Sequence, residues 1–347
     1  MKFSFRYYGP TDPIDIKYIS QIPGLYSIVS AVYDTKVGDV WSYKSINDLR
    51  NLAIDNNLKF EVVESVPVHE DIKLGKPTRD KYIENYKENI RRLGEAGVKC
   101  ITYNFMPVFD WTRTTLTYKN EDSSTSLAYF PNEINGIDPR KDNIHLPGWD
   151  ESYTKEELNN LLDEYSHITH EDLWNNLEYF LKAIMPVAIE YRVKMAIHPD
   201  DPPYDIFNLP RIITNEENLD RLLKIYDSPY NTLCFCTGSL GVVKSNDLVH
   251  MVDKYSKMNR ISFMHVRNIK YIKDGFVETS AYDSEGSLPI KEIMKTLVKN
   301  NYDGYIRPDH GRMIFGEVGK PGYGLYDRAL SLEYLKGLEE AYKDEQI

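Results

Sequence analysis

The chain has 347 residues, 41% of them hydrophobic and 27% charged, and a formal net charge of −11 at pH 7. This length suits either two domains or one large α/β barrel. The acidic balance argues against nucleic acid or an anionic membrane as a partner, because such a protein does not neutralise phosphate over a broad face. No stretch resembles a signal peptide or reaches the length of a membrane span, and three cysteines do not form a disulfide framework. We therefore expect a cytoplasmic protein.

Short runs rich in β-branched and aromatic residues recur along the chain, and each is followed by a segment with helical spacing. The eight predicted strands are Phe3–Gly9, Leu25–Val32, Phe60–Val66, Lys99–Phe105, Val193–Pro199, Thr232–Gly238, Ile261–Asn268 and Gly304–Gly311. Strands that alternate with helices are typical of βα units in a parallel sheet, and eight such units predict a (β/α)8 TIM barrel. In this fold the chemistry takes place at the C-terminal ends of the strands.

The helical segments carry apolar residues at spacings of three and four. The segment after the second predicted strand opens at Ser45, a favourable N-cap residue, and places Ile46, Leu49 and Leu52–Ala53 on one face. A longer apolar stripe precedes the fifth predicted strand and consists of Leu173, Leu177, Phe180–Leu181, Ile184 and Ala188.

The segment from about residue 107 to residue 170 breaks this rhythm. It follows the fourth predicted strand and is rich in Asp, Asn, Ser, Thr and Tyr. A structureless loop of this length is improbable within a compact domain. We interpret the segment as an insertion that covers the barrel mouth, within a single catalytic domain spanning residues 1–347.

Each of the last four predicted strands ends in a residue that can bind a metal. These residues are His198 in "AIHPDD", Cys236 in "FCTG", His265 in "FMHVRN" and Asp309 in "RPDHG". Imidazole, thiolate and carboxylate are the side chains that bind first-row divalent metals. One such residue alone would more simply be a satisfied polar group. Four of them at one level on adjacent strands predict a metal site.

The two cysteines in "TLCFCTG" share one face of their strand, because side chains alternate with a period of two. Cys236 lies nearer the C-terminal end and is the better ligand, whereas Cys234 lies one layer deeper. Neighbours so close on a strand rarely reach disulfide geometry. We expect Cys234 and Cys100 to pack in the core.

Two arginines share strand faces with the predicted ligands: Arg267 with His265, and Arg307 with Asp309. Guanidinium groups beside a divalent metal suggest an anionic ligand such as a carboxylate. Alternatively, they offset local carboxylates such as Asp200, Asp201 and Asp309.

Further candidates for substrate contact are Arg6 and Tyr8, which end the first predicted strand, and Asn104, which ends the fourth. Glu64 and His69 follow the third strand, where they could contact sugar hydroxyls or cap the next turn.

Several longer strings resemble the D-mannonate dehydratase family. They run in collinear order from Arg6 to the last helix: "RYYGPTDP", "VVESVPVHEDIK", "YNFMPVFDWTRT", "IHPDDPP", "CTGSLG", "RPDHG" and "PGYGLYDRA". The resemblance implies a xylose-isomerase-like barrel that removes water from D-mannonate and forms 2-dehydro-3-deoxy-D-gluconate, in glucuronate catabolism. It implies one Mn²⁺ or Fe²⁺ per chain, bound by the four predicted ligands, and acid/base roles for His310 and Tyr323. We also expect a homo-oligomer, namely a dimer.

This reaction explains why such groups are needed. Removal of the proton at C2, next to a carboxylate, builds up negative charge that a divalent metal can neutralise. A base for that proton and an acid for the departing C3 hydroxyl, placed on opposite faces of the substrate, complete the requirements. The simpler alternatives are that His310 only orients the metal site and that Tyr323 only packs its loop.

Three other functions fit parts of the pattern. A sugar isomerase or epimerase on the same barrel would usually gather Glu and Asp ligands, so Cys236 fits it less well. A zinc endonuclease is disfavoured by the acidic charge. A non-catalytic metalloprotein that binds sugar acids would have no need of an acid/base pair.

Overall fold

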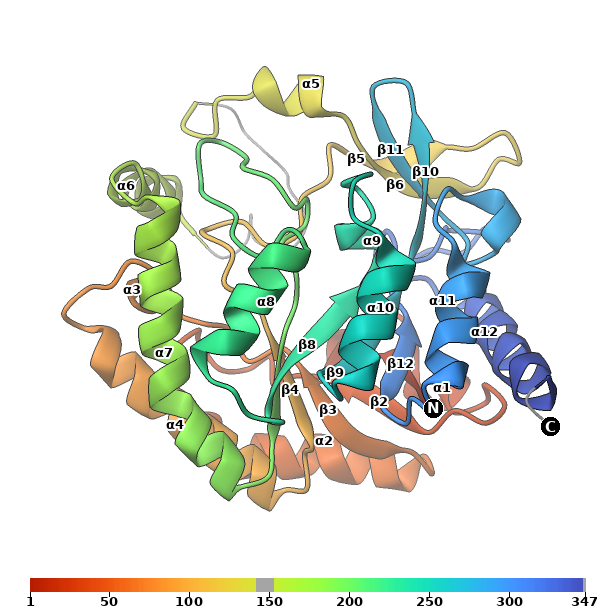
Figure 1. Cartoon of the computed structure of the whole chain (residues 1–347), viewed down its shortest axis with the longest axis horizontal. Coiled ribbons are helices and arrows are strands. Elements are labelled where there is room, and N and C mark those ends of the chain that lie inside the picture. Colours follow the sequence, from red (N-terminus) through yellow and green to blue (C-terminus); the bar gives the residue numbers. More distant parts are fainter. Residues whose placement is uncertain (142–152, 346–347) are drawn as a thin grey trace.

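The computed structural model describes residues 1–141 and 153–345, and in this part of the chain eight parallel strands form a closed barrel surrounded by helices (Figure 1). The barrel strands are β1 (Lys2–Arg6), β2 (Ser27–Ser30), β3 (Lys59–Glu64), β4 (Cys100–Tyr103), β7 (Lys194–Ile197), β8 (Asn231–Cys236), β9 (Ile261–Val266) and β12 (Tyr305–Pro308). β1 pairs with β12 and closes the ring. The eight predicted strands and the TIM barrel are confirmed.

Helices follow the strands along the chain, and the longer ones pack against the outside of the barrel. They are α1 (Ile16–Ile19), α2 (Tyr43–Asp55), α3 (Glu70–Lys73), α4 (Arg79–Glu95), α7 (His170–Glu190), α8 (Glu216–Ile225), α9 (Thr237–Leu240), α10 (Leu248–Lys257), α11 (Ile290–Lys299) and α12 (Tyr326–Asp344). Within the described residues, none of the helices has the length and apolar character needed to cross a bilayer.

The predicted start of α2 was wrong by one turn. Ser42 is the N-cap residue, and its hydroxyl accepts a hydrogen bond from the backbone N–H of Ser45 at 3.0 Å. Ser45 is therefore the third helical residue, and both serines fit the cap by residue type alone. The predicted apolar face is correct, since Ile46, Leu49 and Ala53 are buried.

The barrel interior holds one apolar layer below the level of the predicted ligands. It consists of Val29, Val62, Cys100, Ala196, Cys234, Phe263 and Tyr305. Cys100 and Cys234 therefore lie in the core as expected, and all three cysteines are free. The side chains on the other face of the strands pack against the helices; Phe180 of α7, for example, makes an edge contact with Tyr103 of β4.

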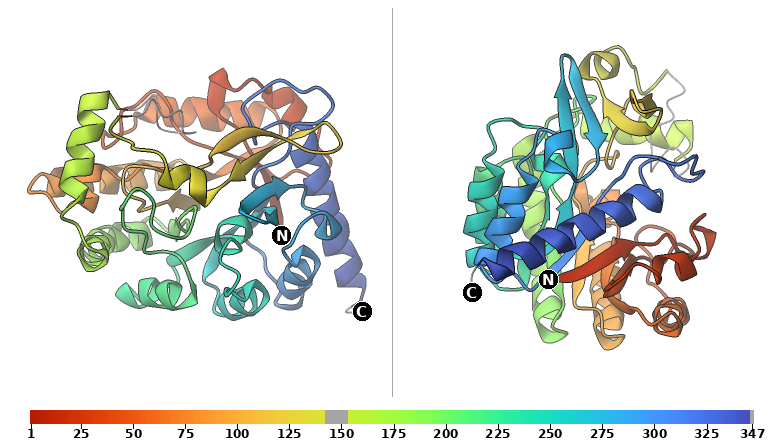
Figure 2. Two further views of the ribbon diagram at one scale, coloured as in Figure 1. Left: turned by 90° about the horizontal axis from the view of Figure 1, so that it is seen from above. Right: turned by 90° about the vertical axis from the view of Figure 1, so that its right-hand side faces the viewer.

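A second, four-stranded sheet lies above the C-terminal ends of the barrel strands, and we call it the lid sheet (Figures 1 and 2). The insertion after β4 supplies β5 (Thr115–Lys119) and β6 (Thr125–Tyr129), followed by α5 (Pro131–Asn135) and α6 (Lys155–Tyr165). Residues 142–152 of the predicted insertion lie outside the described residues. The hairpin of β10 (Asn268–Ile272) and β11 (Gly275–Thr279), which follows β9, completes the sheet in the order β10-β11-β6-β5.

Buried ion pairs join the lid sheet to the barrel. Arg113, just before β5, donates two hydrogen bonds to Asp201, after β7, at 2.9 and 3.0 Å. It also contacts Glu278 of β11, with its Nε 2.8 Å from Oε1. The exposed fractions of these side chains are 0%, 0% and 3%. A charge buried this deeply is tolerated only when it is paired and hydrogen-bonded.

We expect Arg113→Leu to lower the free energy of unfolding by about 3 kcal/mol, because two buried carboxylates lose a shared cation. Urea denaturation followed by circular dichroism measures the change. Arg221→Leu is the control, because Arg221 pairs with Glu171 on the surface, where both side chains are exposed, and its loss should cost less than about 1 kcal/mol. If both variants lost the same small amount of unfolding free energy, Arg113 would not stabilise the contact between the lid sheet and the barrel.

Candidate active site and metal centre

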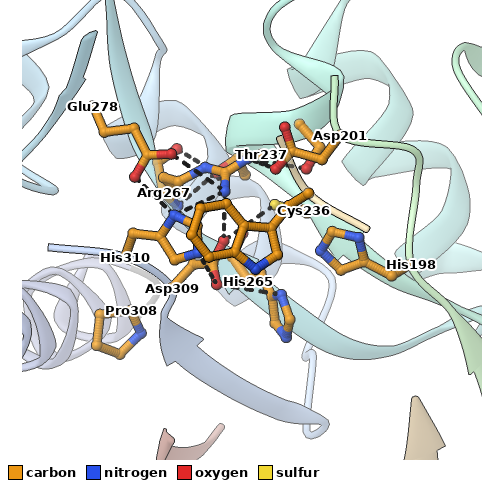
Figure 3. A network of polar contacts seen from close by, with 12 residues as sticks. His198, Asp201, Cys236, Thr237, His265, Arg267, Glu278, Pro308, Asp309 and His310 are labelled. Carbon is orange, nitrogen blue, oxygen red and sulfur yellow. Dashed lines mark hydrogen bonds and ion pairs between the residues drawn. The ribbon is translucent and has the colours of Figure 1, made fainter. Parts of the chain in front are cut away.

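The four predicted ligands converge at the C-terminal end of the barrel (Figure 3). His198 follows β7, Cys236 ends β8, His265 lies in β9 and Asp309 follows β12. One ligand atom from each residue lies within 4.8 Å of those of the other three. Cys236, His265 and Asp309 are buried and His198 is partly buried.

The two imidazoles are oriented so that each can present a nitrogen to a cation. His198 Nδ1 lies 2.7 Å from the carbonyl oxygen of Pro199, which only accepts, so Nδ1 carries the hydrogen and Nε2 is free to bind. His265 Nε2 lies 3.2 Å from a Glu64 carboxylate oxygen, and Nδ1 lies 3.7 Å from Asp309 Oδ1. Among the described residues, neither His265 nitrogen has a hydrogen-bond partner of good geometry. A carboxylate behind an imidazole is the usual support of a metal-binding histidine.

Asp309 is held as a carboxylate by neighbouring cations. Its oxygens lie 2.9 Å from Arg307 and 3.1 Å from Arg267. Burial disfavours the charged form, but His310, Arg307 and Arg267 outweigh it and hold the pKa of Asp309 well below its usual range. Cys236 Sγ lies 3.6 Å from Asp309 Oδ2. Two imidazoles, a thiol and a carboxylate suit a first-row divalent ion, so the residues fit a metal.

A cavity of about 540 Å³ lies over this cluster. Its lining includes two of the ligands, His198 and Asp309, and seven further candidates named from the sequence: Arg6, Tyr8, Glu64, Asn104, Arg267, His310 and Tyr323. Arg6 holds its guanidinium 4.5 Å from the centre of the Tyr8 ring, so a cation and a phenol lie side by side on one wall.

Arg307 does not belong to this lining. Both Nε and one terminal nitrogen bind Glu64, at 3.1 and 2.8 Å, and the same terminal nitrogen lies 2.9 Å from Asp309. Arg307 therefore neutralises Glu64 and Asp309, two carboxylates that line the cavity, which is the role that the alternative interpretation of the sequence gave it. Arg267 lines the cavity and also binds Asp201 at 2.6 Å, so it offsets a local carboxylate, and its contact with the substrate stays a prediction.

Glu64 and His69, which both come from the region of the third predicted strand, lie in different parts of the structure. Glu64 lines the cavity next to the metal cluster. His69 lies outside that lining and is the N-cap residue of α3, where its Nδ1 accepts a hydrogen bond from the backbone N–H of Asp71 at 3.1 Å. Its ring also stacks on Tyr82, with the ring centres 3.6 Å apart. The capping role is the one observed for His69.

His310 and Tyr323 form one hydrogen-bonded unit. His310 Nε2 lies 2.9 Å from the Tyr323 hydroxyl, so the two groups do not face each other across the cavity. On its other side, His310 Nδ1 lies 2.8 Å from Glu278 Oε2. The Trp111 ring covers His310, with the ring centres 4.8 Å apart.

Glu278 and Trp111 were not predicted from the sequence as site residues. A signal for the first exists, because "YIKDGFVET" contains Asp274–Gly275 between two β-rich runs and so predicts a hairpin after the seventh strand. That hairpin delivers Glu278 to the site. Trp111 follows β4 within the insertion, where a single aromatic residue carries no pattern.

The D-mannonate dehydratase (UxuA) family model matches residues 1–347. "Mannonate dehydratase" of Oceanobacillus iheyensis is 51% identical, with 98% of this chain and 97% of that protein covered. "Mannonate dehydratase 2" of Halalkalibacterium halodurans is 52% identical, with 98% and 99% covered.

Solved structures agree with this result. The crystal structure of mannonate dehydratase from Streptococcus suis serotype 2 superposes with a TM-score of 0.94 at 48% identity, covering 100% of this chain and 96% of that one. A D-tagatose 3-epimerase-like protein (TM-score 0.56, 14% identity, all of both chains covered) shares the fold. A match over its whole length and relatives identical at half of their positions place this chain in the D-mannonate dehydratase family.

Proposed function

We propose that this protein catalyses the metal-dependent dehydration of D-mannonate to 2-dehydro-3-deoxy-D-gluconate and water, a step in the catabolism of hexuronates such as glucuronate. The observation that carries the proposal is the convergence of the four metal-binding side chains on a cavity that also contains His310 and Tyr323. The full-length family match supports the same reaction.

The cavity provides for the negative charge of the substrate and of the reaction. We infer that Arg6 and Arg267, which both line it, bind the hexonate carboxylate, with Tyr8 and Asn104 near the hydroxyl groups. A divalent ion, Mn²⁺ or Fe²⁺, held by His198, Cys236, His265 and Asp309, would stabilise the charge that develops beside that carboxylate when the C2 proton leaves.

Tyr323 and His310 can both give and take a proton. Burial, helped by the nearby Tyr8 and Asp309, raises the pKa of Tyr323 well above its ordinary value, so its hydroxyl keeps its proton. His310 Nε2 lies at hydrogen-bond distance from that hydroxyl. We infer that this unit takes the proton from C2 and delivers a proton to the C3 hydroxyl, which leaves as water.

Other functions find less support. The epimerase-like structures share 14% identity or less with this chain and so indicate only the fold. A protein that merely binds sugar acids would not need His310 and Tyr323 joined beside the ligand cluster. The expected dimer and the cytoplasmic location stay predictions.

With Mn²⁺ or Fe²⁺ and D-mannonate, we expect the protein to form the 2-keto-3-deoxy acid, measured colorimetrically. Tyr323→Phe should lower kcat by about 100-fold or more, the usual contribution of a positioned acid or base. Tyr282→Phe is the control, because Tyr282 is exposed and lies outside the cavity. Turnover of Tyr323→Phe within twofold of wild type would remove this residue from the mechanism.

We expect the purified protein to bind one divalent ion per chain. Cys236→Ala should weaken that binding by at least about tenfold, because even the loss of a residue that only hydrogen-bonds to a metal ligand has an effect of this size. Cys234→Ala, in the core layer below, should keep the affinity. Elemental analysis gives the stoichiometry, and titration with Co²⁺ followed by the thiolate charge-transfer band gives the affinity. Loss of the band in Cys234→Ala but not in Cys236→Ala would contradict the assignment.

A further inference from the structure

One acidic residue reaches the active site from the lid sheet and not from the barrel. β11 pairs with β6 of the insertion, with Phe276 opposite Tyr129 and Val277 opposite Ala128. Because side chains alternate along a strand, Glu278 shares a face with Phe276. The guanidinium of Arg113 lies 5.1 Å from the centre of the Phe276 ring, so this face points to the buried ion pairs.

Glu278 carries a buried, ionised carboxylate, and both of its oxygens contact a charged or polar partner. It is 2% exposed. Arg113 contacts Oε1 with Nε at 2.8 Å and with a terminal nitrogen at 2.6 Å, while His310 Nδ1 lies 2.8 Å from Oε2. Burial disfavours its charge, but His310, Arg113 and Arg267 outweigh burial, so its pKa lies below the ordinary value.

This contact determines which nitrogen of His310 carries a hydrogen. An ionised carboxylate only accepts hydrogen bonds, so the bond at Oε2 requires a hydrogen on Nδ1. A terminal nitrogen of Arg267 also lies 3.2 Å from Nδ1 and could donate to it if Nδ1 were bare. That form would place the Nδ1 lone pair 2.8 Å from the ionised Oε2 of Glu278, so the shorter contact favours the hydrogen on Nδ1. With Nδ1 held in this way, Nε2 faces Tyr323 at 2.9 Å and can exchange a proton there.

We propose that Glu278 is a positioning residue for the dehydration: from the lid sheet it holds His310 in the form with a hydrogen on Nδ1 and directs Nε2 to Tyr323, while Arg113 fixes Glu278. This inference rests on the roles proposed for His310 and Tyr323. The arrangement follows the logic of a catalytic triad, in which a buried carboxylate orients a histidine toward the group it serves.

The structure gives a specific expectation for Glu278→Gln, which preserves size. Arg113 donates to Oε1, so the amide oxygen of glutamine should stay there and its NH₂ group should face His310. The NH₂ group donates, so it favours the form of His310 with the hydrogen on Nε2 and a bare Nδ1. We expect kcat to fall by at least about tenfold, as for other residues that orient a histidine, with KM within about threefold.

Two further measurements separate positioning from a merely structural role. Nitrogen NMR of ¹⁵N-histidine-labelled protein, with the His310 signals assigned from their loss in His310→Gln, should show the hydrogen on Nδ1 in the wild type and on Nε2 in Glu278→Gln. In addition, the double variant Glu278→Gln/His310→Gln should be no slower than His310→Gln alone, because Glu278 acts through His310.

The matched control is Glu339→Gln, which removes another buried carboxylate. Glu339 lies on α12, outside the cavity lining, and is 2.8 Å from the Met1 ammonium. This variant should keep wild-type kcat. Wild-type kcat in Glu278→Gln together with loss of activity in His310→Gln would overturn the inference and leave the proposed function standing. So would additive losses in the double variant. Full activity in His310→Gln would instead overturn the proposed acid/base unit, and with it the catalytic part of this inference.

Discussion

The buried carboxylate of Asp309 imposes the main constraint on this active site, because an ionised group in the barrel interior is stable only next to cations. Arg267, which follows the neighbouring strand β9, and Arg307, on β12 itself, contact it at 3.1 and 2.9 Å. Each arginine also binds a second carboxylate, Asp201 or Glu64. The charges therefore form a shared network, and a metal ion added to it would meet a carboxylate ligand that is already ionised and oriented.

This sharing explains why the lid and the metal cluster belong to one electrostatic unit. Arg113 binds Asp201 and Glu278, and Arg267 binds Asp201 and Asp309. A series of alternating positive and negative side chains thus leads from the insertion to the metal ligand Asp309, and each side chain in it is paired. In a medium of low dielectric constant such a series is costly to leave incomplete, because a lone charge keeps its full desolvation penalty.

The parts of the site that could be predicted from the sequence are those fixed by regular periodicity. His198, Cys236, His265 and Asp309 could be assigned because parallel barrel strands end at one level and alternate residues share a face. The contact of Arg307 with Glu64 could not, since 243 positions separate them and nothing in either segment specifies the partner. The pairing of β6 with β11 could not be predicted from the sequence for the same reason, although the turn between β10 and β11 does carry a local signal. The misplaced start of α2 shows the local limit: two serines three positions apart satisfy the same capping rule.

The lid sheet is built from two segments that the barrel strands β7, β8 and β9 separate along the chain. A nascent or partly unfolded molecule could close its barrel and gather the metal-binding side chains while β6 still lacks β11. Such a molecule would bind the ion without presenting a correctly oriented His310. The ability to bind the metal and the ability to turn over substrate should therefore arise at different times during folding. Turnover should begin only after the lid sheet has formed.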